Sequence, residues 1–134
     1  MALIRHLALR CRDMHVTRKF YETAFEWEFL GMRPSNLGCD LSDGTHNVTL
    51  LQQPADDDRP PQRDGQEYLH FGIIVEDLAV CRGRLEALGA EFATDAIKLE
   101  QQGDGGEVSF KVLDPDGNVI DITCNHEEWK GVTI

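Results

Sequence analysis

Hydrophobic and polar positions alternate at the start of the chain, between Leu3 and Arg10. A period of two is that of a half-buried strand, so the pattern predicts a strand whose polar face carries His6. Beyond it the hydrophobic spacing becomes helical. Asp13 suits the N-cap position, and an amphipathic helix is predicted from about Met14 to Glu26, with four side chains facing inward: Val16, Phe20, Ala24 and Trp27.

Short strands are predicted after this helix, and the second half of the chain repeats the same order of elements. In the second half Asp77 caps a helix that begins at Leu78 and ends at Gly89. Each half therefore reads as one strand, one helix and three strands. The strands after the first helix are predicted at 28–33, 37–42 and 47–53, and those of the second half at 67–75, 91–96, 108–113 and 119–124.

The two halves also share a sequence signature. His6 is followed seven residues later by Asp13, and His70 by Asp77, each across an apolar alternating stretch. An Asp-Gly turn leads into the last strand of each half, at positions 43–44 and 116–117. We infer a duplicated and fused fold, in which paired strands bring His6 and His70 together.

Composition sets the boundaries between these modules. Residues 54–66 contain three prolines and three successive aspartates, which cannot bury much surface and so mark a linker. The predicted organisation is a first module at 1–53, the linker at 54–66, a second module at 67–124 and a tail at 125–134, together forming one structural domain.

Charge and cysteine content narrow the function. The net charge of −11 opposes binding to nucleic acid or anionic membranes. The N-terminus lacks a long apolar segment and no apolar run could cross a bilayer, so a cytoplasmic protein is expected. The cysteines lack a Cys-x-x-Cys pair, which favours reduced, mostly buried thiols over a disulfide framework, a zinc knuckle or a catalytic cysteine: Cys11, Cys39, Cys81 and Cys124.

Asp121 is the residue that suggests chemistry. It lies between Ile120 and Ile122 in the last strand, and we align it with Leu50 of the first half. A carboxylate among apolar neighbours is costly if buried, unless something pairs with it. A divalent metal ion (Fe, Mn, Ni or Zn) held by His6, His70 and Asp121 would supply that pairing and leave coordination positions open. Asp121 would be the anionic ligand and the catalytic proton acceptor.

Taken singly, each of these three residues is also typical of an ordinary polar side chain on the open side of a sheet. The matched positions of the two histidines favour the metal hypothesis over that alternative. The other histidines have no partner in the repeat. His15 and His126 are predicted to be surface groups, and His46, on the turn before the strand that carries Leu50, is the best candidate to support a ligand.

These residues identify a family resemblance. The chain resembles the vicinal oxygen chelate superfamily, which includes glyoxalase I, extradiol dioxygenases, and bleomycin and fosfomycin resistance proteins. The resemblance spans about Leu3 to Thr123 and rests on these matches: His6 with Asp13, Phe20-Tyr21, His70 with Asp77, Leu88-Gly89, and Asp114-Pro-Asp-Gly-Asn118 before Asp121. It implies an α+β fold of two tandem βαβββ modules that form a cup-shaped mixed sheet.

The resemblance also implies a ligand set. In metal-dependent relatives the ligands come from the first strand of each module and from a last strand, which corresponds here to His6, His70 and Asp121. Asp121 is one methylene shorter than the usual glutamate. Leu50 stands where glyoxalase I has a further carboxylate, so the set is more dioxygenase-like than glyoxalase I-like. Relatives are frequently homodimers, which leaves open whether the site lies within one chain or between two.

The leading hypothesis is a metal-dependent dioxygenase or lyase that acts on a small substrate through two adjacent oxygen atoms. The alternative is a metal-free small-molecule binding protein of the bleomycin-resistance type. In that case aromatic side chains would hold the ligand. A third hypothesis is a scaffold with a degenerate site and an interaction role. The aromatic candidates are Trp27, Phe29 and Tyr68, with Trp129 of the tail as a lid over the cup or a dimer contact.

Overall fold

The computed structural model describes residues 1–57, 70–93 and 108–132 of the chain. The chain divides into two compact units, a first unit at Met1–Pro61 and a second unit at Gln62–Ile134. Most of the predicted linker, Tyr68 and the beginning of the strand predicted at 67–75 lie outside the described residues. The module boundaries therefore stay a prediction.

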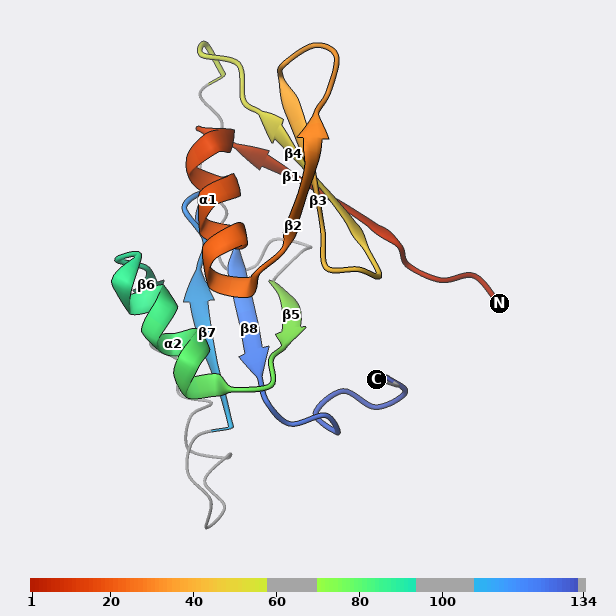
Figure 1. The fold of residues 1–134 in the computed structure, drawn as a ribbon, viewed down its shortest axis with the longest axis vertical. Coiled ribbons are helices and arrows are strands. Elements are labelled where there is room, and N and C mark those ends of the chain that lie inside the picture. Colours follow the sequence, from red (N-terminus) through yellow and green to blue (C-terminus); the bar gives the residue numbers. More distant parts are fainter. Residues whose placement is uncertain (58–69, 94–107, 133–134) are drawn as a thin grey trace. The chain divides into compact units, whose positions relative to one another are not determined.

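The first unit is a four-stranded mixed sheet with one helix (Figure 1). The sheet order is β1-β4-β3-β2, with β1 parallel to β4 and the remaining neighbours antiparallel. Helix α1 contacts all four strands, so it covers one face of this sheet. The elements are β1 (His6–Cys11), α1 (Met14–Phe25), β2 (Glu28–Met32), β3 (Gly38–Ser42) and β4 (Asn47–Gln52).

The second unit repeats this arrangement. Its sheet order is β5-β8-β7-β6, again with the first strand parallel to the last. Helix α2 runs beside β7 (Figure 1), where Arg82 lies over the ring of Phe110 at 4.4 Å. The predicted fold of two tandem βαβββ modules is thereby confirmed. The elements are β5 (His70–Ile74), α2 (Leu78–Ala87), β6 (Glu91–Phe92), β7 (Ser109–Leu113) and β8 (Val119–Thr123).

The helices begin where the sequence predicts. The carboxylate of Asp13 accepts hydrogen bonds from the backbone N–H groups of His15 and Val16, and that of Asp77 accepts one from Val80. These bonds satisfy donors that the first helical turn leaves without intrahelical partners. Helix α2 is followed by Gly89 in the left-handed conformation, with φ of +70°.

The inward face of α1 differs from the prediction at its first turn. Val16 is 52% exposed, whereas Met14, Thr17 and Tyr21 are buried. The buried stripe is centred away from Val16, which lies at its margin. Trp27 follows the end of the helix and stacks on Tyr21, with ring centroids 4.8 Å apart and planes 8° apart.

Alternation along the strands separates two faces of each sheet. In the second unit one face contributes core side chains, and the other, the polar face, carries His70, Lys111 and Asp121 together with Gly72. The polar face of the first sheet carries His6, Asp40, Asn47 and Thr49. The core side chains of β7 and β8 are all almost completely buried: Phe110, Val112, Ile120 and Ile122.

The turn between β7 and β8 depends on a buried carboxylate. Asp114 is 4% exposed and accepts hydrogen bonds from the backbone N–H groups of Asp116 and Asn118 and from the Asn118 side chain, all at 2.8–2.9 Å. This carboxylate closes the turn that leads into β8, the strand that carries Asp121.

We predict that Asp114→Ala lowers the free energy of unfolding by about 1–3 kcal/mol, because three donors of half-buried residues lose their acceptor. Chemical denaturation measures this change. The matched control is Glu86→Ala, which removes one carboxylate from the exposed side of α2 and should change stability by less than about 0.5 kcal/mol. Equal effects of the two substitutions would contradict the role of Asp114.

Candidate functional site

His70 and Asp121 approach each other on the polar face of the second sheet. They lie on the adjacent parallel strands β5 and β8, where Gly72 is the register partner of Asp121. His70 Nε2 lies 3.8 Å from Asp121 Oδ2. This separation exceeds a hydrogen bond, and both side chains remain accessible, at 39% and 20% exposure. The imidazole and the carboxylate are therefore near neighbours, and both can reach a shared ligand.

Asp121 does not need a metal ion to be tolerated in its strand. Ile120 and Ile122 on either side point to the opposite face, into the core. On the polar face Asp121 stands directly across from Lys111 of β7, an opposite charge at a cross-strand pair position. The cost of a carboxylate between two isoleucines is thus smaller than the sequence suggests, and the proximity of His70 remains as the argument for a site.

His6 is held in a defined orientation on the first sheet. Its Nδ1 lies 2.7 Å from the side-chain oxygen of Asn47, its register partner on β4. An amide oxygen only accepts hydrogen bonds, so Nδ1 carries the proton of the neutral ring and Nε2 carries the free lone pair. Metal-binding histidines typically have this arrangement, with one ring nitrogen bound to a protein acceptor and the other directed at the metal.

The residue of the first sheet that corresponds to Asp121 is Thr49. Asp121 pairs with Gly72, two residues after His70, and Thr49 pairs with Ala8, two residues after His6. The alignment of Asp121 with Leu50 was therefore wrong by one residue. Leu50 is completely buried on the core face. A shift of one residue along a strand moves a side chain to the opposite face of the sheet, so the polar-face counterpart of Asp121 is Thr49 and not Leu50.

Asp40 is a polar-face residue that the sequence analysis missed. It lies beside Thr49 in the register of β3 and β4, and Thr49 Oγ1 donates a hydrogen bond of 2.6 Å to its carboxylate. Arg33 donates another, at 3.0 Å, and the Asn47 amide donates a third, at 3.3 Å. The alternation of Asp40 and Ser42 with the apolar Cys39 and Leu41 was the available signal. Together these side chains form a continuous polar network that ends at His6.

This network lowers the pKa of Asp40. Burial of the carboxylate by itself raises the pKa, but the hydrogen bonds from Thr49, Arg33 and Asn47 and the positive charge of Arg33 outweigh that effect. The ionised Asp40 carboxylate accepts from Thr49 and from the Asn47 amide, and the second of these bonds keeps Asn47 in place for His6.

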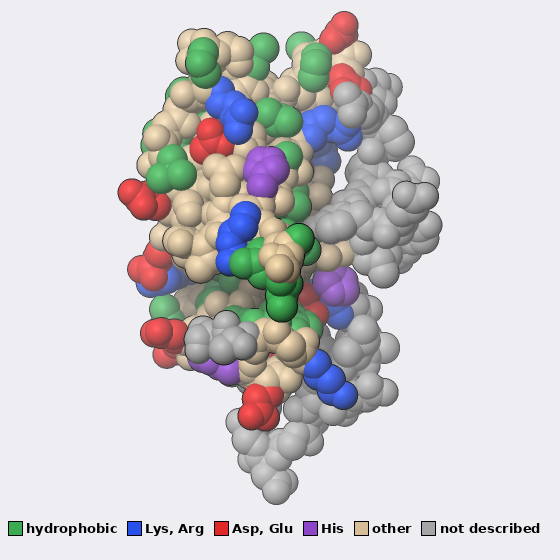
Figure 2. All heavy atoms as spheres, turned by 90° about the vertical axis from the view of Figure 1, so that its right-hand side faces the viewer, with side chains coloured by type: hydrophobic (Ala, Val, Ile, Leu, Met, Phe, Trp, Pro, Cys, Tyr) green, Lys and Arg blue, Asp and Glu red, His purple; other side chains and the backbone are tan. Residues whose placement is uncertain are grey.

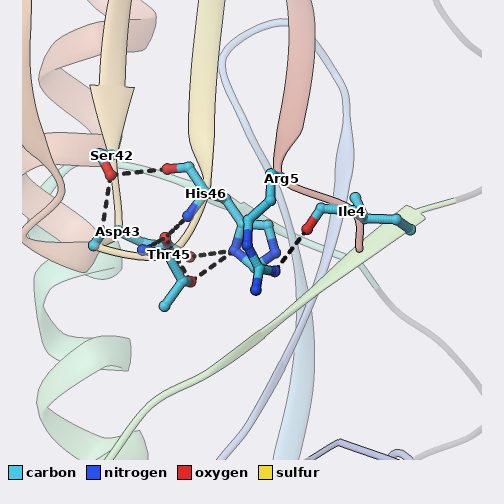
Figure 3. A network of polar contacts seen from close by, with 7 residues as sticks. Ile4, Arg5, Ser42, Asp43, Thr45 and His46 are labelled. Atoms are coloured by element: carbon cyan, nitrogen blue, oxygen red, sulfur yellow. Dashed lines mark hydrogen bonds and ion pairs between the residues drawn. The ribbon is translucent and has the colours of Figure 1, made fainter. Parts of the chain in front are cut away.

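His46 belongs to a separate polar cluster in the turn between β3 and β4 (Figure 3). Its ring Nδ1 lies 3.1 Å from Asp43 and 2.8 Å from the hydroxyl of Thr45. Its backbone N–H donates to Asp43, and Ser42 donates to its carbonyl. These contacts give His46 a role in closing the turn. Its predicted support of a ligand stays a prediction.

The remaining candidates take structural or surface positions. His15 and His126 are exposed, as predicted. Histidine side chains at the surface are visible in Figure 2. All four cysteines are free thiols, and burial raises the pKa of Cys81 to about 11, only partly offset by Arg84 and Arg82. Two aromatic candidates serve packing: Trp27 stacks on Tyr21, and Phe29 lies under Arg18.

Among residues 1–57, 70–93 and 108–132, no three His, Cys, Asp or Glu side chains gather into a group that would hold a metal ion by themselves. The second unit brings two predicted ligands together, His70 and Asp121. His6 belongs to the first unit. Its convergence with the other two stays a prediction. The donors present, two imidazoles and one carboxylate, suit a divalent transition metal.

The fold and the arrangement of its strands define the chain as a protein of two βαβββ modules. The chain belongs to the Glyoxalase/Bleomycin resistance protein/Dioxygenase superfamily, whose family model matches residues 3–122. This confirms the resemblance inferred from the sequence. No curated protein sequence matches the chain. Neither of the two helices in the described part of the chain is long and apolar enough to span a membrane.

Several solved structures share this fold. The fosfomycin resistance protein FosX from Mesorhizobium loti is 14% identical, with a TM-score of 0.68 and coverage of 93% of each chain. A possible glyoxalase from Bacillus cereus is 23% identical, with a TM-score of 0.65 and coverage of 92% of this chain and 100% of that chain. A point mutant of FosX from Listeria monocytogenes is 18% identical, with a TM-score of 0.66 and coverage of 95% of this chain and 92% of that chain.

The low pKa of Asp40 predicts a specific pH dependence. A carboxylate whose pKa is lower in the folded protein stabilises the fold above its ordinary pKa of 3.8, and this contribution disappears as the pH falls through the lower, folded value. Asp40→Asn keeps an acceptor oxygen but removes the charge. Wild type should exceed the variant in stability at neutral pH, and the difference should shrink as the pH falls below 3.8.

Denaturation of both proteins across the range from neutral pH to below 3.8 measures this difference. Asp43, whose pKa is also lowered, is present in both proteins and cancels in the comparison. A difference that stays constant or grows toward acid pH would contradict the account of Asp40.

Proposed function

We propose that this protein is a metal-dependent enzyme that acts on a small substrate through two adjacent oxygen atoms, with His6, His70 and Asp121 as the metal ligands. The observation that supports the proposal most is the approach of His70 Nε2 to Asp121 Oδ2, 3.8 Å apart on the polar face of the second sheet. The second is the bond between His6 Nδ1 and Asn47, which leaves the Nε2 lone pair of His6 available.

The chemistry follows from these donors. A bound Fe, Mn, Ni or Zn ion would supply Lewis acidity toward a substrate with two vicinal oxygens. His6 and His70 act as neutral donors, and Asn47 keeps His6 in the required tautomer. Asp121 would contribute negative charge as a ligand of that metal and could serve as a proton acceptor. Lys111, across from Asp121, places a positive charge on the same face of the sheet.

A protein of this fold provides a precedent for both metal and ligand. The FosX mutant from Listeria monocytogenes was crystallised with Mn(II) and 1S,2S-dihydroxypropylphosphonic acid, a compound with two adjacent hydroxyl groups. The low identity limits the comparison to the fold. Within this proposal, the class of substrate is a small molecule whose neighbouring oxygens chelate the metal.

The first sheet provides the argument for choosing between a dioxygenase and a glyoxalase I type of site. The position equivalent to Asp121 is Thr49, a neutral residue that is already bound to Asp40 and Arg33. The first module therefore offers no carboxylate at that position, and this supports a three-ligand set of the dioxygenase kind over the four-ligand set of glyoxalase I. We further propose a cytoplasmic homodimer, in which the site forms within one chain or across the interface.

A metal-free ligand-binding protein of the bleomycin-resistance type is the second candidate. It is favoured by Lys111, which stands across from Asp121 and already provides the carboxylate with an opposite charge. Metal retention separates the two candidates.

We predict that purified protein incubated with Mn(II), Fe(II), Ni(II) or Zn(II) retains one ion per site, and that His70→Ala and Asp121→Asn each weaken the affinity at least about 10–100-fold, the range seen when only the groups that orient ligands are removed. Elemental analysis and calorimetry measure retention and affinity. His126→Ala is the matched control, since His126 is exposed in the same unit, and it should bind metal as wild type does.

Two results would contradict the proposal. Wild-type protein without stoichiometric metal would rule out metal-dependent catalysis and leave the second candidate. Equal loss of metal in the His126→Ala control would show that binding occurs at surface histidines in general.

A further inference from the structure

The indole of Trp129 lies directly on strand β5 at Gly72. A Cβ atom added to Gly72 would meet Trp129 Cη2 at 2.3 Å, Cζ2 at 2.4 Å and Cζ3 at 3.0 Å. Real Cβ atoms essentially never approach another atom below 3.0 Å. A side chain larger than glycine at position 72 would therefore push the indole away from its observed position on β5.

This contact places the indole on the polar face of the second sheet. The Cβ of residue 72 would point to the same face as His70, because the two positions are separated by one full strand period. Asp121 is the register partner of Gly72. The far end of the indole therefore lies on the same face of the sheet as His70 and Asp121, at the strand position that pairs with Asp121.

Short local hydrogen bonds position the segment that carries Trp129. The backbone N–H of Asn125 donates to Thr123 Oγ1. The side-chain oxygen of Asn125 accepts from the backbone N–H of Glu127, and the backbone carbonyl of Asn125 accepts from the backbone N–H of Glu128. The Trp129 carbonyl accepts from the N–H of Val132. The tail thus turns back just after β8. The side chain of Trp129 is half-buried, so part of its ring remains accessible.

We propose that Trp129 determines ligand specificity at the site inferred above. The indole forms a flat, apolar wall next to Asp121, and it favours ligands in which the two chelating oxygens are attached to a flat apolar group, such as an aromatic ring. This inference rests on the proposed function, because it needs a metal held by His70 and Asp121. Stacking on the exposed part of the indole provides the preference.

Two hydroxamates that chelate a metal through the same pair of oxygens provide the test. Benzohydroxamate carries a phenyl ring and acetohydroxamate a methyl group. The dissociation constant of acetohydroxamate divided by that of benzohydroxamate, measured by calorimetry with Mn(II)-loaded protein, isolates the contribution of the phenyl ring. We expect this ratio to be roughly 3- to 10-fold higher in wild type than in Trp129→Ala, the order of one aromatic contact.

Three further variants sharpen this comparison. Gly72→Ala keeps the indole in the chain but displaces it from β5, and it should reduce the ratio as Trp129→Ala does. Trp27→Phe removes the tryptophan that packs on Tyr21 in the first unit and should leave the ratio unchanged. In the Trp27→Phe protein Trp129 is the sole tryptophan, so benzohydroxamate should change its fluorescence emission. Combining Trp27→Phe with Gly72→Ala should abolish that change.

The possible outcomes separate the inference from the proposed function. Wild-type protein that binds no Mn(II) would overturn both. Protein that binds Mn(II) with the same hydroxamate ratio in wild type, Trp129→Ala and Gly72→Ala would overturn the specificity role of Trp129 alone, as would an unchanged Trp129 emission in the Trp27→Phe protein. A reduced ratio in both variants with normal Mn(II) affinity would support it.

Discussion

The parallel pairing of the first and last strands within each module is the constraint on which the site depends. In the first unit it joins β1 to β4, and in the second unit β5 to β8. The register of these pairs decides which side chains share the polar face. It places Asn47 beside His6, and it brings Asp121 near His70 by pairing it with Gly72. Without this register neither histidine would have its partner.

The two modules use the same positions for different purposes. In the first sheet the strand position of Asp121 is occupied by Thr49, which donates to Asp40. Asp40 also accepts from the Asn47 amide, and the Asn47 oxygen holds the ring of His6. In the second sheet His70 and Asp121 face each other without a hydrogen bond, and Lys111 stands where the first sheet has Asp40. The duplication has therefore diverged into one sheet that orients a single imidazole and one that presents an imidazole with a carboxylate.

Much of the fold could be predicted from the sequence, because the periods of two and 3.6 residues are strong signals in short, well-capped elements. Asp13 and Asp77 marked both helix starts. The predictions that needed register were weaker. The sequence pairs Leu50 with Asp121 because each lies two residues after a valine near the start of the last strand of its module, and only the strand pairing shows that Thr49 is the true counterpart.

Contacts between residues that are far apart in the sequence were the least predictable part of the site. Asp40 is one polar residue of an ordinary alternating strand until its position beside Thr49 is known. The sequence marks Trp129 as an aromatic side chain in the tail, but its fit on Gly72 depends on the turn after β8. Val16 was placed inward because helical spacing alone does not locate the centre of the buried stripe.

Anomalous diffraction from crystals grown with Mn(II) or Zn(II) tests the central claim most directly. The account predicts one metal peak per site, within about 2.0–2.3 Å of His6 Nε2, His70 Nε2 and an Asp121 carboxylate oxygen, the range for nitrogen and oxygen ligands. The histidine and carboxylate ligands would come from one chain or from two chains of a dimer. No peak between these side chains, or a peak that lacks any one of the three, would contradict the account.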